Sequence, residues 1–282
     1  MAPVVAIIAQ GAMGAGIAAR LHAHGVQVLT SLEGRSEKSA ARAKAAGMIA
    51  ASENEIAAAD IILSIVPPSE ALSLAKRLAP ALTAATRKPL YADCNAISPG
   101  TVADVEALIA QTCCPFVDAG IIGGPPREGY TPVLYCSGAQ AKALLPLRDL
   151  GLDIRPLEGP IGAASGLKMC YAGLTKGFTA LGAAMLLAAE RSGAAPALHE
   201  ELKASQPGLL AFLTRGVPDM FAKAYRWEGE MREIADFTGG GPEQDIYTAI
   251  AALYARLAAD MAGERREIGQ LAGFFGPQVP KG

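Results

Sequence analysis

The chain opens with an extended apolar run, a short glycine-containing turn and then helical spacing. Val4–Ile8 is rich in β-branched residues, which is typical of a buried strand. Met13, Ile17 and Leu21 follow at intervals of four residues and therefore share one helix face. A second apolar run covers residues 26–30. This order of strand, helix and strand predicts two parallel strands joined by a crossover helix.

The alternation continues through the first half of the chain and stops in the second. Further strand-like runs lie at residues 61–66, 90–92, 116–117, 133–137 and 153–157, the last two expected at one edge of the sheet in antiparallel orientation. From residue 162 the spacing is helical, with helices expected at residues 165–192, 197–213, 217–235 and 245–271. We therefore predict an α/β fold, with an N-terminal Rossmann domain built on a doubly wound sheet at residues 1–158 and an all-α C-terminal domain at residues 159–282.

Composition excludes several classes of protein. Hydrophobic residues make up 51% of the chain and charged residues 18%, which is the balance of an ordered globular protein. The net charge of −2 lacks the basic excess of a nucleic-acid binder or a polybasic membrane-surface protein. Five cysteines without CxxC spacing and three histidines predict neither a disulfide framework nor a metal site. Two lysines interrupt the apolar stretch 163–189, so we expect a buried helix there, no membrane span, and a cytoplasmic protein whose partner is a small molecule.

A dinucleotide-binding fingerprint follows the first strand. The segment A-Q-G-A-M-G at residues 9–14 is similar to the G-x-G-x-x-G turn, whose middle glycine lets a pyrophosphate approach the backbone and whose last glycine lets the helix pack on the strand. Ala9 replaces the first glycine of that turn. The position between a strand and a helix favours nucleotide binding over a plain strand–helix turn. The residues predicted to bind the pyrophosphate are Gly11, Ala12, Met13 and Gly14.

The residues after the second strand choose between NAD and NADP. An acidic residue there holds the ribose hydroxyls of NAD, whereas arginine and serine hold the 2′-phosphate of NADP. The segment contains Glu33 as well as Arg35 and Ser36. The guanidinium fork and the hydroxyl favour NADP, with NAD as the alternative. A solvated loop in which Arg35 is only a surface charge is the other interpretation.

Five motifs in order extend over nearly the whole chain. They are A-Q-G-A-M-G at 9–14, S-I-V-P-P at 64–68, D-C-N at 93–95, D-A-G-I-I-G-G at 118–124 and G-A-A-S-G-L-K at 162–168. With them the chain resembles the β-hydroxyacid dehydrogenase and 6-phosphogluconate dehydrogenase superfamily, and more closely its poorly characterised 6-phosphogluconate-dehydrogenase-like oxidoreductases. The resemblance implies an NAD(P)-binding Rossmann domain and a helical domain for substrate binding and dimerisation, so a homodimer is expected.

The lysine that ends the last motif is the expected catalytic group. By resemblance Lys168 is the acid/base, and its chemistry agrees, because hydride addition to a carbonyl leaves negative charge on oxygen that an ammonium stabilises and protonates. A lysine that only covers a helix face is the alternative. Tyr171 lies three residues further on, where its hydroxyl is expected to orient the substrate or assist proton transfer, unless it is a core tyrosine. The resemblance also places Val66, Pro67 and Asn95 along the nicotinamide half of the cofactor.

This chain differs from the family pattern at positions that bind the substrate in the related enzymes. The pair of asparagines that follows the lysine in hydroxyacid dehydrogenases is absent, and Ile122 replaces a serine that helps to bind a carboxylate. Gly123 and Gly124 keep backbone N–H groups for the substrate. Arg127 is a candidate cation for an anionic substrate or else a solvated loop residue.

The sequence therefore predicts an NAD(P)-dependent oxidoreductase. Its reaction moves a hydride between the nicotinamide and the carbonyl or hydroxyl carbon of a small substrate, such as a β-hydroxyacid or a related ketone. An imine reductase is the second interpretation, although those proteins generally lack a lysine at the position of Lys168. A dinucleotide-sensing or scaffold protein without turnover is the third, and Ala9 and Ile122 keep it open.

Overall fold

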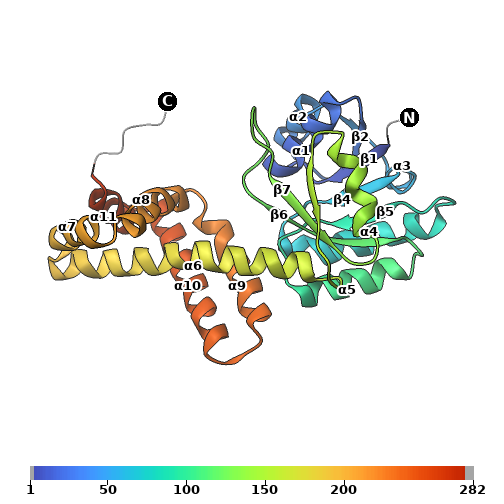
Figure 1. The fold of residues 1–282 in the computed structure, drawn as a ribbon. Coiled ribbons are helices and arrows are strands. Elements are labelled where there is room, and N and C mark those ends of the chain that lie inside the picture. The colour runs from blue at the N-terminus through green and yellow to red at the C-terminus, as the bar shows by residue number, and fades with distance from the viewer. Residues whose placement is uncertain (1–2, 277–282) are drawn as a thin grey trace. The chain divides into compact units, whose positions relative to one another are not determined.

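The chain forms two compact units, residues 1–169 and 170–282. The computed structural model describes residues 3–276 (Figure 1). The first unit is an α/β layer structure and the second is all-α, so the predicted fold class is confirmed. The first unit ends inside a long helix, past residue 158 where the sequence analysis sets the division.

The sheet of the first unit has eight strands in the order β3-β2-β1-β4-β5-β6-β7-β8. All neighbours are parallel except β6 and β7, so the expected antiparallel pairing is found where β7 joins the sheet. Strand β3 was not predicted, because its apolar run of three residues, Met48–Ala50, is too short to indicate a strand by itself. The bounds are β1 Val4–Ile8, β2 Gln27–Thr30, β3 Met48–Ala50, β4 Ile61–Ser64, β5 Leu90–Asp93, β6 Phe116–Ile122, β7 Val133–Ser137 and β8 Asp153–Pro156.

Helices cover both faces of this sheet. Along β1, Val5 and Ile7 join one buried cluster and Ala6 and Ile8 join another. A strand that is buried on both faces carries a continuous apolar run instead of an alternating one, which accounts for the sequence of Val4–Ile8. The helices of this unit are α1 Ala12–Ala23, α2 Glu37–Ala45, α3 Glu53–Ala57, η1 Pro68–Glu70, α4 Ala71–Ala84, α5 Pro99–Ala110 and η2 Ala141–Arg148.

The helices after α6 are shorter than the sequence predicts, whereas α6 itself closely matches the predicted helix at residues 165–192. Residues 197–213 do not form one helix, because Gln206 has φ −136° and ψ 54° and Pro207 starts a new helix at its first position. Residues 245–271 are also divided, since Arg265 adopts a positive φ of 56°. The helices are α6 Ala163–Ser192, α7 Ala195–Ser205, α8 Pro207–Phe221, α9 Ala224–Thr238, α10 Gly241–Ala262 and α11 Arg266–Phe274.

Helix α6 is long and apolar enough, by length and composition, to cross a membrane. Half of its most apolar 18-residue window is nevertheless buried inside the protein, as in the core helix of a globular domain.

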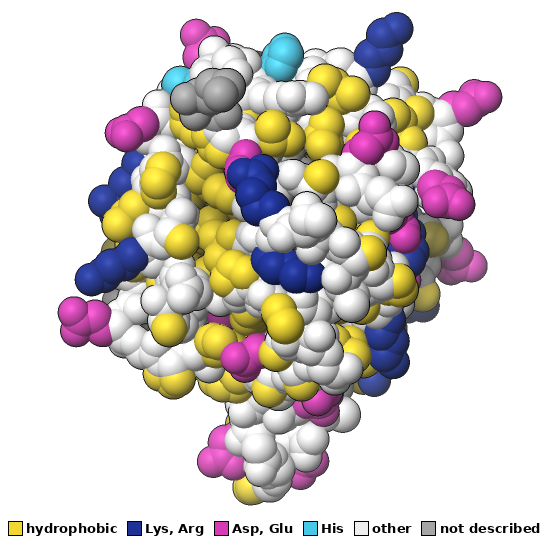
Figure 2. Space-filling view, turned by 90° about the vertical axis from the view of Figure 1, so that its right-hand side faces the viewer, with side chains coloured by type: hydrophobic (Ala, Val, Ile, Leu, Met, Phe, Trp, Pro, Cys, Tyr) yellow, Lys and Arg dark blue, Asp and Glu magenta, His cyan; other side chains and the backbone are white. Residues whose placement is uncertain are grey.

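On the face of the molecule in Figure 2, basic and acidic side chains are interspersed, so this face has no continuous basic patch.

Candidate dinucleotide and catalytic site

The N-terminus of α1 is open and has the features of a site that could bind an anion. Gly11 is its N-cap residue, no side chain caps the helix, and the first turn has no acidic residue. Gly11 and Ala12 are exposed, and a Cβ added at Gly11 would meet nothing within 4 Å. The first N–H groups of a helix have no intrahelical acceptor, and the helix dipole favours negative charge there. The turn therefore fits the pyrophosphate of a dinucleotide, with room above Gly11 for its oxygens.

Two further glycines let other segments approach α1 closely. A Cβ at Gly14 would overlap the carbonyl oxygen of Ala9 and lie 3.5 Å from Cγ2 of Ile7, so α1 packs on β1 at this position. A Cβ at Gly16 would lie 2.8 Å from Cδ of Pro126, so the loop after β6 packs on the same helix. The sequence analysis singles out Gly14 for helix–strand packing but does not include Gly16, which lies outside the fingerprint.

A buried hydrogen-bond chain holds the turn although Ala9 replaces the first glycine. Nε2 of Gln10 donates to Oγ1 of Thr30 at 2.5 Å and to the carbonyl oxygen of Ser31 at 2.6 Å. Thr30 in turn donates to the carbonyl oxygen of Ile7 at 2.8 Å. The backbone oxygen of Gln10 accepts from Arg42 at 2.8 Å. Gln10 thereby ties the turn to the end of β2, a role that the A-Q-G-A-M-G fingerprint does not assign to this position.

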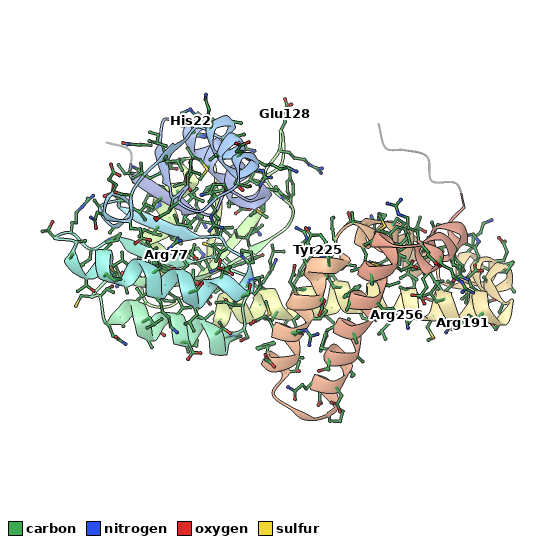
Figure 3. The ribbon with its side chains drawn as sticks, turned by 180° about the vertical axis from the view of Figure 1, so that it is seen from behind. His22, Arg77, Glu128, Arg191, Tyr225 and Arg256 are labelled. Atoms are coloured by element: carbon green, nitrogen blue, oxygen red, sulfur yellow. The ribbon has the colours of Figure 1, made fainter. Side chains whose placement is uncertain are left out.

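A polar pocket of about 110 Å³ lies beside the loop after β2. Its lining includes Arg35 and Val66 together with Arg77 of α4, which is labelled in Figure 3. The other lining residues are Glu70, Ser73 and Leu74. The structure thus brings Arg35 and Val66, which are 31 positions apart in the sequence, to one cavity. Arg77 also forms an ion pair with Glu53 at 3.1 Å.

The other two residues predicted to choose the cofactor are placed differently. Ser36 is the N-cap of α2, where its Oγ accepts from the backbone N–H of Ser39 at 3.3 Å. Glu33 is exposed in the turn before Gly34 and does not line the pocket. Of the three residues, Arg35 is therefore the one that reaches the cavity.

Asn95 holds the loop that follows β4. Its Oδ1 accepts from the backbone N–H of Val66 at 2.7 Å, and its Nδ2 donates to Ser64 and Asp93, both at 2.9 Å. The side chain is 2% exposed. Asn95 thus fixes the position of Val66, while Pro67, the next residue, is exposed at the start of η1.

Lys168 lies in the second turn of α6 and reaches the end of β6. Its Nζ donates to the carbonyl oxygen of Ile121 at 2.6 Å, and the side chain is partly buried. The close approach depends on Gly120, where a Cβ would lie 2.7 Å from the carbonyl oxygen of Ala164 and 3.2 Å from Cβ of Lys168. The ammonium is therefore held at the carboxyl end of a central strand, the end at which parallel sheets bind ligands.

The loop after β6 is closed on itself. The backbone N–H of Gly124 donates to the hydroxyl of Tyr130 at 3.2 Å, and the guanidinium of Arg127 lies 5.3 Å from the centre of the Tyr130 ring. Arg20 of α1 donates to the carbonyl oxygens of Arg127 and Tyr130. Figure 3 shows Glu128 at the tip of this loop. The amide of Gly124, predicted to serve the substrate, is thus bonded to Tyr130, which the sequence analysis did not include.

The remaining predicted site residues are Ile122, Gly123 and Tyr171. Ile122 is half-buried at the last position of β6, and Gly123 follows it with a positive φ of 123°. Tyr171 is 50% exposed on α6 and belongs to the helical unit. Within residues 3–276 no group of three or more His, Cys, Asp or Glu side chains is arranged to hold a metal ion.

Comparison with known protein families covers both halves of the chain. The sequence profile of the NAD binding domain of 6-phosphogluconate dehydrogenase matches residues 4–150, more than half of the chain. The chain belongs to the 6-phosphogluconate dehydrogenase superfamily. Residues 189–257 match a domain of unknown function, DUF1932. The superfamily predicted from the five sequence motifs is therefore confirmed.

Relatives of this superfamily member include proteins without an assigned activity. An uncharacterized 28.5 kDa protein in the 7S RNA 5′ region of Methanothermus fervidus is 30% identical over 215 residues, covering 75% of this chain and 82% of that protein. The conserved protein MTH1747, of unknown function and described as structurally similar to 3-hydroxyacid dehydrogenases, is 30% identical with a TM-score of 0.73 and covers 95% of this chain and 98% of its own.

A characterised enzyme shares the fold at lower identity. The 3-hydroxyisobutyrate dehydrogenase of Mycobacterium tuberculosis, solved with L-serine, is 20% identical to this chain. The match covers 93% of this chain and 96% of that enzyme, with a TM-score of 0.70. The two proteins therefore have the same fold along almost their whole length.

Proposed function

We propose that this superfamily member is an NAD(P)-dependent oxidoreductase that reduces a carbonyl, or oxidises the corresponding hydroxyl, of a small substrate. The observation that carries the proposal is the position of Lys168, whose Nζ is held 2.6 Å from the carbonyl oxygen of Ile121 at the carboxyl end of β6. The open N-terminus of α1 follows the carboxyl end of β1, a strand of the same sheet. The N-terminus of α1 thus binds an anion, and Lys168 of α6 supplies a proton.

Different residues of this chain bind the cofactor and transfer the proton. The nicotinamide, when bound, supplies or accepts the hydride. The backbone N–H groups of Gly11, Ala12 and Met13 bind the pyrophosphate, since the first turn of α1 leaves them without side-chain caps. Lys168 donates a hydrogen bond to the substrate oxygen, stabilises the negative charge that develops there and transfers a proton to it.

The substrate proposed is a small ketone or β-hydroxyacid with little reliance on a carboxylate. Ile122 offers no hydrogen bond where related enzymes carry serine, and the N–H of Gly124 is bonded to Tyr130. Both features reduce the number of donors that this loop presents to a carboxylate. Arg127 is exposed and lies over the Tyr130 ring, and it is the cation available in this loop to an anionic group.

The cofactor proposed is NADP, with the 2′-phosphate in the pocket beside Arg35. Arg35 and Arg77 line this pocket, and a guanidinium binds phosphate in a bidentate manner. Glu70 lines the same pocket and opposes a second negative charge, so it favours the ribose hydroxyls of NAD. Because Arg77 is paired with Glu53, the support for NADP over NAD comes from Arg35.

Steady-state turnover tests this function. Purified protein is mixed with NADPH or NADH and a panel of ketones, β-ketoacids and cyclic imines, and the loss of nicotinamide absorbance is followed. We expect oxidation of NADPH with at least one carbonyl, and loss of that rate by a factor of about 100 or more in Lys168→Ala. The exposed Lys38→Ala serves as the matched control. Turnover of imines alone, unaffected by Lys168→Ala, contradicts the proposal in favour of an imine reductase, and binding without any turnover favours a sensor.

We also propose that the protein is a homodimer joined through α6. Five large apolar side chains on this helix are between 50% and 62% exposed: Tyr171, Leu174, Phe178, Leu181 and Met185. Their spacing alternates between three and four residues, which places them on one continuous stripe. Exposed apolar stripes of this kind are typical of protein–protein interfaces, and a second copy of the chain supplies the same stripe in return. A cytoplasmic location stays a prediction.

A further inference from the structure

Asp118 of β6 is a fully buried carboxylate with four hydrogen-bond donors around it. Its exposure is 0%. Oδ2 accepts from the backbone N–H groups of Ala164 at 3.0 Å and Ser165 at 3.1 Å. It also accepts from the hydroxyl of Ser137 at 2.9 Å, while Oδ1 accepts from the hydroxyl of Ser165 at 2.5 Å. Three of these four bonds come from the first turn of α6.

The carboxylate therefore caps a helix that is distant in sequence. The first N–H groups of α6 need acceptors outside the helix, and a negative charge at this end interacts favourably with the helix dipole. Asp118 supplies the acceptor and the negative charge, although it lies 46 residues before Ala164 in the sequence. Ser137 of β7 reinforces the contact, because its Oγ accepts from the N–H of Ala164 at 3.0 Å while donating to Asp118.

Lys168 follows this capped turn and is held by the same strand. It lies three residues after Ser165, one turn along α6. Its Nζ donates to the carbonyl oxygen of Ile121, three residues after Asp118 on β6. Between these two contacts, Gly120 leaves the space that lets α6 lie against the strand. Strand β6 thus fixes the helix backbone at one point and the lysine ammonium at another.

We propose that Asp118 is a positioning residue for Lys168. The carboxylate holds the first turn of α6 on β6 and so sets the position from which the ammonium reaches a substrate oxygen. This inference rests on the proposed function in assigning the proton transfer to Lys168. Misplacement of a reacting group by about 1 Å costs roughly a hundredfold in rate, so a fixed helix turn has a catalytic consequence.

A neighbouring residue provides a matched comparison. Asp93 of β5 pairs with Asp118 in the sheet and is equally buried. Its carboxyl group accepts from the backbone and side chain of Asn95, whereas three of the four donors to Asp118 belong to α6. Asp93→Asn and Asp118→Asn therefore make the same substitution at two paired, buried positions of the sheet, and one of the two changes the cap of α6.

The experiment compares wild type, Asp118→Asn, Ser165→Ala and Asp93→Asn in two readouts that need no substrate. The first is acetylation of Lys168 by limiting acetic anhydride, measured by mass spectrometry relative to the exposed Lys38. The second is amide hydrogen exchange of a peptide that covers residues 162–169. The kcat and the dissociation constant for NADPH are measured on the same samples.

We expect Asp118→Asn to raise the Lys168 to Lys38 labelling ratio about threefold or more and to speed exchange of the α6 amides about tenfold. We expect kcat to fall about tenfold or more with NADPH binding unchanged. Ser165→Ala removes one of the four hydrogen bonds and gives a smaller effect in the same direction, which keeps the test available if Asp118→Asn does not fold.

Two results overturn the inference. The first is Lys168 labelling and amide exchange equal to wild type in both Asp118→Asn and Ser165→Ala, because the cap then does not position the lysine. The second is the same change in Asp93→Asn as in Asp118→Asn, because loss of any buried carboxylate then suffices. If no variant and no wild-type sample turns over a carbonyl, the proposed function fails, while labelling and exchange still decide whether Asp118 positions Lys168.

Discussion

Asp93 and Asp118 lie opposite each other on the paired strands β5 and β6, and neither carboxyl group is exposed. Burial raises the pKa of Asp93 to about 7, against the hydrogen bonds from Asn95, which lower it, and with a smaller upward contribution from the charge of Asp118. Asp118 is surrounded by donors from β7 and α6. Asp93, with its pKa raised to about 7, thus lies beside the carboxyl group that caps α6.

Asp93 is expected to make the protein less stable as pH rises from about 4 to about 7. In this range the folded state binds a proton at Asp93 that the unfolded chain, with its ordinary pKa near 4, has released. The free energy of unfolding therefore falls with pH across this window and is unaffected by this group outside it. Urea denaturation at pH 5 and at pH 8 measures the effect, which is at most a few kcal/mol at about 1.4 kcal/mol for each pKa unit.

The matched variant for this prediction is Asp93→Asn, which cannot ionise. We expect the difference in unfolding free energy between pH 5 and pH 8 to be smaller in Asp93→Asn than in wild type by at least about 1 kcal/mol. Equal pH dependence in the two proteins contradicts the raised pKa.

Gly11 and Gly14 are expected to fail in different ways when changed to alanine. A Cβ at Gly11 meets nothing in the protein but occupies the space assigned to the pyrophosphate. Gly11→Ala should therefore weaken NADPH binding about tenfold or more while lowering stability by less than about 1 kcal/mol. Gly14→Ala places its Cβ on the Ala9 carbonyl oxygen and should lower both binding and stability, the latter by about 1–3 kcal/mol.

The control for both glycine variants is Gly229→Ala, at a helical position where a Cβ meets nothing within 4 Å. Calorimetric titration with NADPH and thermal unfolding separate the two effects. Wild-type affinity in Gly11→Ala would show that the pyrophosphate does not lie over this turn.

Opposite changes in cofactor preference are expected from Arg35 and Glu70, which share one pocket. Arg35→Ala removes a cation from the 2′-phosphate and should raise the dissociation constant for NADPH about tenfold or more, with little change for NADH. Glu70→Gln removes the opposing charge and should tighten NADPH binding. Lys76→Ala, exposed on the same helix as Arg77, is the control. Equal loss of both nucleotides in Arg35→Ala excludes a 2′-phosphate contact.

A charge on the exposed stripe of α6 is expected to break the homodimer. Phe178 lies at the middle of the five stripe residues and is 54% exposed. Phe178→Glu should convert a dimeric mass in light scattering into a monomeric one with little change in helicity, because a buried unpaired carboxylate costs several kcal/mol at an interface. The control is the exposed Arg191→Gln at the end of α6. A monomeric wild type contradicts the proposal at once.

Much of the fold is predictable from sequence because it depends on local patterns. The run Val4–Ile8, the glycine turn and the helix after it specify a strand–helix–strand unit within thirty residues. Ser98 and Pro99 likewise begin α5 as an N-cap and first helical residue. The division of residues 245–271 into two helices was missed, since Arg265 adopts a positive φ without a glycine or proline at that position to indicate it.

The site was predicted less completely because its hydrogen bonds join distant segments. The resemblance places Asn95 along the nicotinamide, which stays a prediction, and the hydrogen bonds of its side chain to Val66, Ser64 and Asp93 are specified by no local pattern. Gln10 lies within the A-Q-G-A-M-G fingerprint at a position to which that motif assigns no role, and Tyr130 lies outside all five motifs. Their partners lie 20 and 6 residues away, so their roles appear only in the folded chain.

The most direct test of the account is a transfer experiment with NADPH that carries deuterium at the reactive C4 position. The protein is incubated with the labelled cofactor and the best carbonyl substrate of the panel, in wild type and in Lys168→Ala. The account predicts that deuterium appears on the carbonyl carbon in amounts equal to the NADP⁺ formed, and that the rate falls about a hundredfold in the variant while NADPH still binds. NADPH binding without transfer of deuterium to any carbonyl, or transfer at the same rate in Lys168→Ala, would contradict it.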